Sequence, residues 1–275
     1  IANRYLAAPP SASPTSLETM LGCPLRWVLQ YKAGIREPLI TVLLERQLLY
    51  GNFAHQLLGD YLIDFIGKPL PKPDLAAAAI GARFDALVGS EAAPLAKPGM
   101  DREKTYVRET LVGAARALIG LLGKGDYRIA SIEQPHAGDF LLGKLEGRTD
   151  LIVRRVKDGM AAVIDLKWSS EGPKIDALKN GTALQLAAYS YLNQDKKSWP
   201  PTGYFLFPTA QLYSTSEKDF PGAVHIAGPS EQEVWQAAME LTGETRATLD
   251  AGKVRAACVV DETDSAEAGE DSGIM

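Results

Sequence analysis

Residues 147–170 read GRTDLIVRRVKDGMAAVIDLKWSS, and this stretch sets two carboxylates and one lysine into two otherwise apolar segments. The dipeptide Asp158-Gly159 in its middle is typical of a tight hairpin, because a two-residue hairpin turn needs positive φ, which Asp and Gly tolerate. The flanking segments are rich in Val, Ile and Leu, which suit a pleated surface. The stretch therefore predicts two antiparallel strands, at residues 148–156 and 161–168.

The hairpin also predicts which side chains share one face of the sheet. With Asp158-Gly159 as the loop, Asp150 lies opposite Lys167. Ile152 then lies opposite Asp165, and a four-residue loop gives the same register. Because opposed residues and residues two apart on a strand share a face, Asp150, Asp165 and Lys167 are expected to converge far from the turn. A three-residue loop without a bulge would shift the register by one and move Asp150 to the other face.

Two neighbouring carboxylates on one face repel each other, and burying them without a positive partner is costly. Lys167 can supply part of the compensating charge. A divalent cation held by oxygen ligands supplies it more completely and also performs chemistry. The alternative is an ion cluster on the solvated side of an antiparallel sheet, and the spacing alone does not decide between the two.

The composition is ordinary for a globular protein with one large domain: 275 residues, 46% hydrophobic and 23% charged. The sequence has neither an apolar run of membrane-spanning length nor the basic-then-apolar start of a signal peptide, which predicts a cytoplasmic protein without a membrane partner. Because the chain begins with Ile1 rather than Met, we expect a piece of a longer protein. Two cysteines, Cys23 and Cys258, are too few for a disulfide framework or a four-thiolate metal site.

The net charge of -5 neither indicates nor excludes nucleic-acid binding, since binding follows the local field in a groove. Much of the negative charge lies in residues 261–271, which contain six acidic residues and little apolar content. This composition predicts an acidic, disordered tail over residues 259–275.

Helical periodicity dominates the first half of the chain, and strand-like segments dominate the second. Ser13-Pro14 is typical of a helix N-cap followed by Pro at the first helical position. The order predicts an α/β core with a helical N-terminal elaboration, divided into an arm and helical part at 1–124, a core with a final helix at 125–258, and the tail. The expected helices cover residues 14–28, 43–66, 75–87, 102–122, 175–192 and 231–249, and the expected strands 129–133, 141–156, 161–168 and 202–207.

Polar residues on the expected helices before and after the hairpin are further candidates for a functional site. Gln185 and Tyr189 follow it at i and i+4 on an expected helix, so they share a helix face. Upstream, His55 lies on an expected helix, and the N-capped first helix ends in the run CPLRW at residues 23–27.

This ordered set resembles the PD-(D/E)XK nuclease superfamily, and within it the RecB-like nuclease domains of bacterial helicase–nuclease subunits such as RecB and AddB. The matching pieces are the serine-capped helix with its CPxxF-like end, a helical His, the strand motif GRTD, the strand motif DLK, and QLAAY on the next helix. The resemblance covers residues 13–189. It implies a restriction-endonuclease-like core with a mixed central sheet flanked by helices, and DNA as substrate.

Carried over residue by residue, the resemblance implies that His55, Asp150 and Asp165 hold Mg²⁺ or Mn²⁺, with the carbonyl oxygen of Leu166 as a further ligand. Asp150, Asp165 and Lys167 would be catalytic, with Lys167 orienting the attacking water and offsetting phosphate charge. Gln185 and Tyr189 would position the DNA backbone or the active-site groups. Many AddB-like relatives bind an iron–sulfur cluster through four cysteines, and two cysteines here imply none.

Several residues have plain structural alternatives. His55 could be a satisfied helix-face histidine, and Gln185 and Tyr189 could lie at a core boundary. Glu133 could be an additional carboxylate behind the site, although a solvated strand end is favoured. Packing is favoured over base stacking for Trp27 and Trp168, and the arginines at 148, 154 and 155 need no phosphate role.

The leading hypothesis is a metal-dependent deoxyribonuclease, exonuclease favoured over endonuclease, acting in DNA repair or recombination beside a helicase-type partner or fused domain. The main rival is a catalytically idle DNA-end-binding or scaffold module of the same fold. A third possibility, an α/β domain for another ligand, requires the hairpin charges to be scattered. We expect Asp165→Ala and Lys167→Ala each to abolish cleavage while leaving the fold in place, because Asp165 is expected at a polar strand end.

Overall fold

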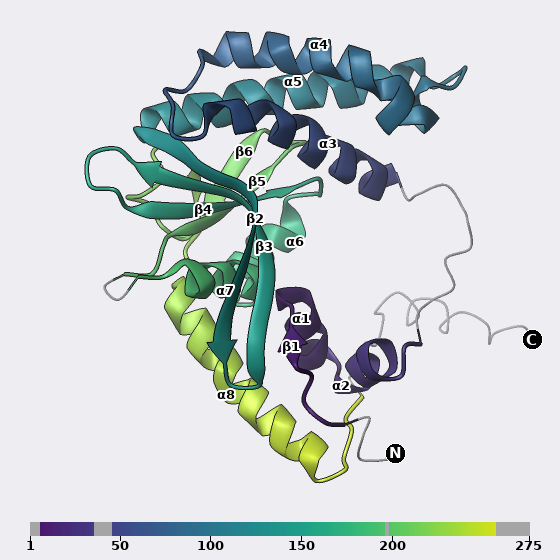
Figure 1. Ribbon diagram of the computed structural model, residues 1–275, viewed down its shortest axis with the longest axis vertical. Coiled ribbons are helices and arrows are strands. Elements are labelled where there is room, and N and C mark those ends of the chain that lie inside the picture. The colour runs from purple at the N-terminus through teal and green to yellow at the C-terminus, as the bar shows by residue number, and fades with distance from the viewer. Residues whose placement is uncertain (1–5, 36–45, 196–197, 257–275) are drawn as a thin grey trace, which may run out of the picture.

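The computed structural model describes residues 6–35, 46–195 and 198–256 and shows one mixed sheet between two groups of helices (Figure 1). Helices α3 (Arg46–Leu62), α4 (Pro73–Glu91) and α5 (Asp101–Lys124) cover one face. Helices α7 (Leu184–Asn193) and α8 (Glu231–Asp250) lie on the other. This arrangement confirms the predicted α/β core with a mixed sheet flanked by helices.

The sheet joins strands in the order β1-β3-β4-β5-β6-β7, with β2 paired to β3. Antiparallel pairing links β2, β3 and β4, whereas β4 and β5 are parallel and are joined by a crossover through α6 (Gly172–Lys179) and α7. The strands are β1 (Ser11–Ala12), β2 (Tyr127–Phe140), β3 (Gly143–Arg155), β4 (Ala161–Lys167), β5 (Thr202–Leu206), β6 (Gln211–Ser214) and β7 (Val224–His225).

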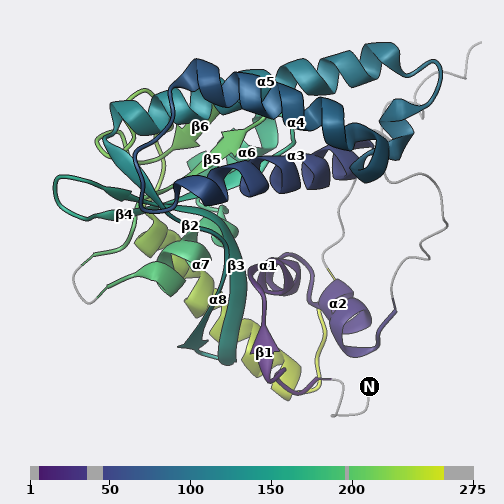
Figure 2. The ribbon, with the colours of Figure 1, turned by 45° about the horizontal axis from the view of Figure 1, so that its top comes forward.

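Two large apolar clusters hold the layers together. One fills the space between α3, α4, α5 and the central strands, and includes Phe53, Phe84 and Ile164. The other packs α1 (Pro14–Gly22), α7 and α8 around the outer half of the β2–β3 hairpin, with Leu145 at its centre. Figure 2 shows the α3–α5 layer on one side of the sheet and α1 with α2 (Pro24–Trp27) on the other. The candidate residues on β3 and β4 therefore lie where both groups of helices approach the sheet.

Local sequence explains most element ends. Ser13 caps α1 by accepting a hydrogen bond from the backbone N–H of Ser16, as the Ser-Pro signal predicts. The expected helix at 14–28 breaks at Cys23, because Pro24 disfavours helical backbone in the residue before it. The chain resumes as α2 and one π-helical turn, Val28–Lys32. The expected helix at 175–192 likewise divides into α6 and α7, where Gly181 takes a φ of 67°.

The strands differ more from expectation than the helices. Strand β2 runs seven residues beyond the expected end at 133. Its outer half is polar and contains Pro135 and Gly138, so the sequence there does not predict a strand, but pairing with β3 holds it in one. Strands β1, β6 and β7 were not predicted, since they have two to four residues each. The expected tail at 259–275 lies outside the described residues. Short 3₁₀ turns complete the helical half at Ile63–Phe65 and Ala93–Ala96.

The predicted hairpin register was wrong by two residues. Leu151 pairs with Ile164 and Arg154 with Ala161, so the loop covers residues 156–159 and closes before the expected position. The Arg155 side chain, which forms an ion pair with Asp158 at 2.8 Å, helps close this loop early. A shift of two keeps every side chain on its predicted face.

Within the described residues, no helix combines the length and the apolar character that a membrane crossing requires.

Candidate active site

Asp150 and Asp165 lie opposite each other on the same face of the sheet. The pairing of Leu151 with Ile164, continued by one residue, places the two carboxylates side by side on β3 and β4. Ile152 and Val163, which are two residues from them on the same strands, pack with Tyr189 of α7. The predicted convergence on one face is therefore present, with Asp165 rather than Lys167 opposite Asp150.

The buried Asp165 forms an ion pair with the half-buried Lys167. The Asp165 side chain is 0% exposed, and the Lys167 Nζ lies 2.9 Å from its Oδ1 and 2.8 Å from its Oδ2. Burial lowers the pKa of Lys167, but the carboxylates of Asp165 and Asp150 outweigh burial and raise this pKa above its ordinary value. Lys167 therefore carries a permanent positive charge at the end of β4.

Asp150 lies between this pair and a second group. Its Oδ2 accepts a hydrogen bond of 2.8 Å from the backbone N–H of Leu166, which fixes the carboxyl group against β4. Burial, followed by repulsion from Asp165, raises the pKa of Asp150 to about 8. A carboxyl group with such a pKa needs a further positive charge to ionise fully at neutral pH.

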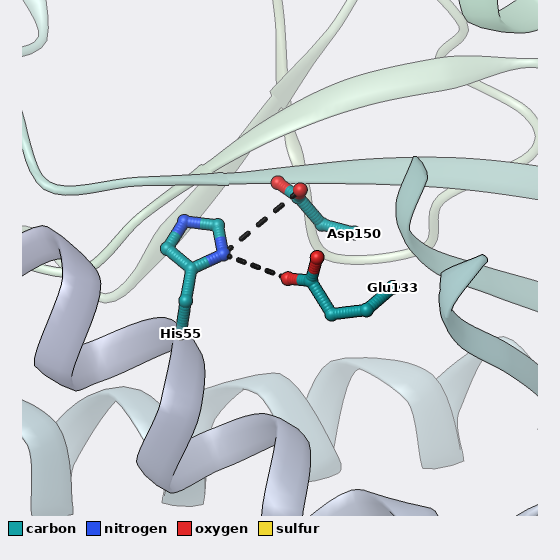
Figure 3. A group of neighbouring side chains, drawn as sticks. All are labelled: His55, Glu133 and Asp150. Atoms are coloured by element: carbon teal, nitrogen blue, oxygen red, sulfur yellow. Dashed lines mark hydrogen bonds and ion pairs between the residues drawn. The ribbon is translucent and has the colours of Figure 1, made fainter. Parts of the chain in front are cut away.

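His55 reaches the sheet from α3 and brings the second group together (Figure 3). Its Nε2 lies 2.8 Å from the carbonyl oxygen of Leu166. Its Nδ1 lies 3.3 Å from Glu133 Oε1 and 3.9 Å from Asp150 Oδ1. The imidazole of His55 and the carboxylates of Glu133 and Asp150 thus offer three ligand atoms within 4.8 Å of one another.

Glu133 is the residue that sequence reasoning set aside. It interrupts the β2–β3 ladder between the pairs Ile132–Leu151 and Gln134–Thr149, so it lies opposite Asp150. Its backbone φ is 48°, an uncommon conformation for a residue other than Gly, which stores strain beside the site. Counting back from the short turn between Phe140 and Gly143 would have found this position, had β2 been recognised as a long strand.

The group suits a divalent ion in two alternative ways. If Nδ1 of His55 binds the ion with Glu133 and Asp150, the Nε2–H remains to donate to Leu166. If instead Nε2 and the Leu166 carbonyl bind the ion, the Nδ1–H donates to Glu133, which then orients the ring. Both follow the rule that a ligating histidine donates its other N–H to a carboxylate or carbonyl.

The three residues whose ligand atoms lie within 4.8 Å of one another do not include Asp165. Its carboxylate faces Lys167, which makes the two acidic residues of the hairpin different in partner and in exposure. The oxygen-rich ligand set of the three residues, with one imidazole, fits Mn²⁺ and Mg²⁺ among the common ions.

Gln185 and Tyr189 lie together on α7. The Gln185 Nε2 donates to the Tyr189 hydroxyl at 2.9 Å, and the Gln185 backbone N–H donates to Glu18 of α1 at 3.0 Å. Burial raises the pKa of Tyr189 to about 12, so its hydroxyl stays protonated at neutral pH. These residues buttress the face that carries Asp150 and Asp165.

A cavity of about 480 Å³ opens beside the His55 group, between α3 and the strands β2 and β3. Arg148 lies on its wall, 67% exposed and 4.0 Å from Glu133. Arg155, in contrast, is engaged by Asp158 and Asp219 near the hairpin loop. Trp27 is buried and donates to Ser16, which agrees with a packing role.

Comparison with known proteins gives the family. The sequence profile of the PD-(D/E)XK nuclease superfamily matches residues 11–261. Among curated proteins, no relative matches this chain. A solved structure of a candidate exonuclease from Eubacterium rectale is similar over 97% of this chain and 91% of its own, with 12% identity and a TM-score of 0.49. Since the profile spans nearly the whole chain, this protein belongs to the PD-(D/E)XK nuclease superfamily.

Proposed function

We propose that this nuclease is a RecB-like deoxyribonuclease that hydrolyses phosphodiester bonds with Mg²⁺ or Mn²⁺ held by His55, Asp150 and Glu133. The observation that carries the proposal is the position of Asp150. On one side it belongs to the cluster of ligand atoms with His55 and Glu133, and on the other it lies beside the ion pair of Lys167 with the buried Asp165. A phosphate bound at Asp150 would therefore meet both a metal and a fixed positive charge.

In this proposal the bound ion, Lys167 and the backbone of Leu166 have different roles in the reaction. A divalent ion, when bound, neutralises phosphate oxygens and lowers the pKa of water. Lys167, held by Asp165, offers a preorganised charge to the developing negative charge of the reaction. The Leu166 N–H keeps one Asp150 oxygen engaged, which leaves the other directed toward His55.

The remaining assignments are proposals of the same kind. Asp165 would join these ligands only if its carboxylate turned from Lys167 to the ion, and the Leu166 carbonyl would be another ligand if the His55 ring binds through Nε2. Gln185 and Tyr189 would keep the α7 face in position. Action on DNA ends, a role in repair or recombination beside a helicase-type partner, and a cytoplasmic location rest on the order of RecB-like motifs.

A cleavage assay tests the proposal. Linear and circular DNA, each single- and double-stranded, is incubated with Mg²⁺ or Mn²⁺, and with chelator as control. An exonuclease degrades the linear forms and spares the circles. Asp150→Asn keeps the oxygen that accepts the Leu166 N–H and removes the charge, so we expect a roughly hundred- to thousandfold slower reaction with an unchanged fold.

The rival function is a DNA-binding scaffold without turnover. The strained Glu133 backbone favours catalysis over this rival, because such strain is kept where a side chain must be aimed. If the unsubstituted protein binds DNA and cleaves none of the four substrates with either metal, the scaffold function replaces the nuclease.

A further inference from the structure

A row of aromatic rings leads from the surface of α5 to the candidate site. Tyr106 meets Trp168 edge to face, with ring centroids 6.4 Å apart. Trp168 stacks on Phe207 at 6.0 Å, and Phe207 lies 6.1 Å from the ring of His55. The four rings thus connect an exposed helix face with a ligand of the proposed metal site.

The outer two rings are accessible and the inner ones support them. Tyr106 is 48% exposed, Trp168 is half-buried, and Phe207 is buried. Tyr50 of α3 contacts Trp168 from the side, with centroids 5.4 Å apart, and its hydroxyl donates to Glu103 at 2.6 Å. Trp168 is therefore held between fixed neighbours, so binding a flat ligand here costs little ordering of its side chain.

Trp168 lies on the α3 side of the sheet, beside the His55 half of the site. It directly follows Lys167 in the sequence. Its Cβ would lie 3.6 Å from a Cβ placed on Gly51, which is one helical turn before His55 on α3. A nucleotide whose phosphate reached Asp150 and Lys167 would have its neighbouring base within reach of Trp168.

Charged side chains of both signs surround the exposed rings. Arg102 is exposed and lies four residues before Tyr106, on the same face of α5. Arg46 is 72% exposed at the start of α3, and Glu103 between them is engaged by Tyr50 and by Arg46 at 3.8 Å. Glu109 is exposed three residues after Tyr106 on the same face, so positive and negative charges are mixed beside the rings, and the rings themselves carry the inference.

We propose that Tyr106 and Trp168 form a platform for an unpaired base next to the scissile phosphate, where the base stacks on one ring and meets the other edge to face, because the two rings are 85° apart. The inference rests on the proposed nuclease function and adds a specificity to it. Bases within a duplex are already stacked and cannot reach a protein ring without unpairing. Stacking of a base on an aromatic ring tolerates any sequence, so the platform selects single strands rather than sequences.

Binding without metal tests the platform separately from cleavage. Single-stranded oligo-dT and a duplex of equal length are titrated in the presence of chelator, and tryptophan fluorescence is followed. We expect oligo-dT to quench the fluorescence of the unsubstituted protein. Trp168→Phe should lose this quenching, and Trp199→Phe, which alters the other half-buried tryptophan among the described residues, should keep it.

Tyr106 offers a matched pair of variants at an exposed position that tolerates change. Tyr106→Leu should weaken single-strand binding roughly 5- to 150-fold and leave duplex binding unchanged, whereas Tyr106→Phe should keep both. Equal affinity of Tyr106→Leu and the unsubstituted protein for oligo-dT would overturn the platform, as would equal weakening for the duplex. A protein that cleaves no DNA but shows the predicted loss in Tyr106→Leu would refute the proposed function and keep the platform.

Discussion

Asp150 has two unlike neighbourhoods, and the difference between them separates stability from function. Toward β4, the buried Asp165 forms an ion pair with the half-buried Lys167, and the two charges balance. Toward α3, His55 and Glu133 are half-buried and add a second carboxylate, for which the described residues offer the exposed Arg148 at 4.0 Å. We call the Asp165–Lys167 pair closed because its charges balance within the protein, although Asp165 Oδ2 has no hydrogen bond among the described residues beside the ion-pair contact. We call the group of His55, Glu133 and Asp150 open because it is suited to a cation from solution. Substitutions on the two sides should therefore have different consequences.

The largest effect is expected from opening the closed pair. Lys167→Ala leaves the fully buried Asp165 carboxylate uncompensated, which should cost about 3–5 kcal/mol of unfolding free energy, together with cleavage. The sequence predicted that both single substitutions spare the fold, and the full burial of Asp165 is the reason that we now expect a loss of stability. Urea unfolding followed by circular dichroism measures the loss.

The control removes both charges together. Asp165→Leu combined with Lys167→Met should recover most of the lost unfolding free energy, because an apolar pair replaces a buried ion pair at little cost. The double variant should remain inactive. A single Lys167→Ala variant as stable as the unsubstituted protein would show that the pair is not closed.

The open group should behave in the opposite way. Glu133→Gln should lower Mn²⁺ affinity roughly 10- to 100-fold, whether Glu133 binds the ion or orients His55, while the unfolding free energy changes little. Calorimetric titration measures the affinity. Asp60→Asn, on the wall of the same cavity but outside the group, is the matched control. Equal weakening in both variants would indicate a diffuse acidic cavity rather than a defined metal site.

The pH dependence of metal binding tests the raised pKa of Asp150. The carboxyl group must lose its proton to bind a cation, and this proton is held up to a pKa of about 8 in the metal-free protein. Mn²⁺ affinity should therefore rise with pH, by up to about tenfold per unit between pH 6 and 8, and level off above. Titrations at several pH values measure the slope, which Asp150→Asn should remove.

The metal-free protein should show the corresponding change in stability. Because the folded pKa of Asp150 lies above its unfolded value, protonated Asp150 stabilises the folded state, and this contribution is lost as pH rises from about 4 toward 8. Unfolding free energies measured with chelator across this range should fall with pH more steeply than those of Asp150→Asn. Parallel curves for the two proteins would contradict the raised pKa.

The smallest effect is expected at the rim. Arg148→Ala should change the unfolding free energy by less than about 0.5 kcal/mol, because the side chain is 67% exposed and its contact with Glu133 is weak. If Arg148 contacts a phosphate, the salt dependence of DNA binding should become shallower by about one unit of slope. An unchanged salt dependence of DNA binding in Arg148→Ala would show that Arg148 does not contact a phosphate.

The sequence by itself determined which side chains of the hairpin share a face. Alternation along β3 and β4 has a period of two, so Asp150, Asp165 and Lys167 stay on one face under any even shift of register. The observed shift of two residues was of this kind. The Ser13 cap and the amphipathic helices α3, α4 and α5 were predictable for a similar reason, because caps and periodicity are encoded within a few neighbouring residues.

Only the tertiary structure decided how the charged residues divide into two groups. Glu133 joins His55 through the long β2–β3 pairing and a backbone φ of 48°, neither of which leaves an apolar pattern in the sequence. Asp165 turns to Lys167 because the helices around the end of β4 bury it, and burial depends on elements distant in the chain. Local periodicity places a side chain on a face, but its partner and its exposure depend on which distant segments pack over that face.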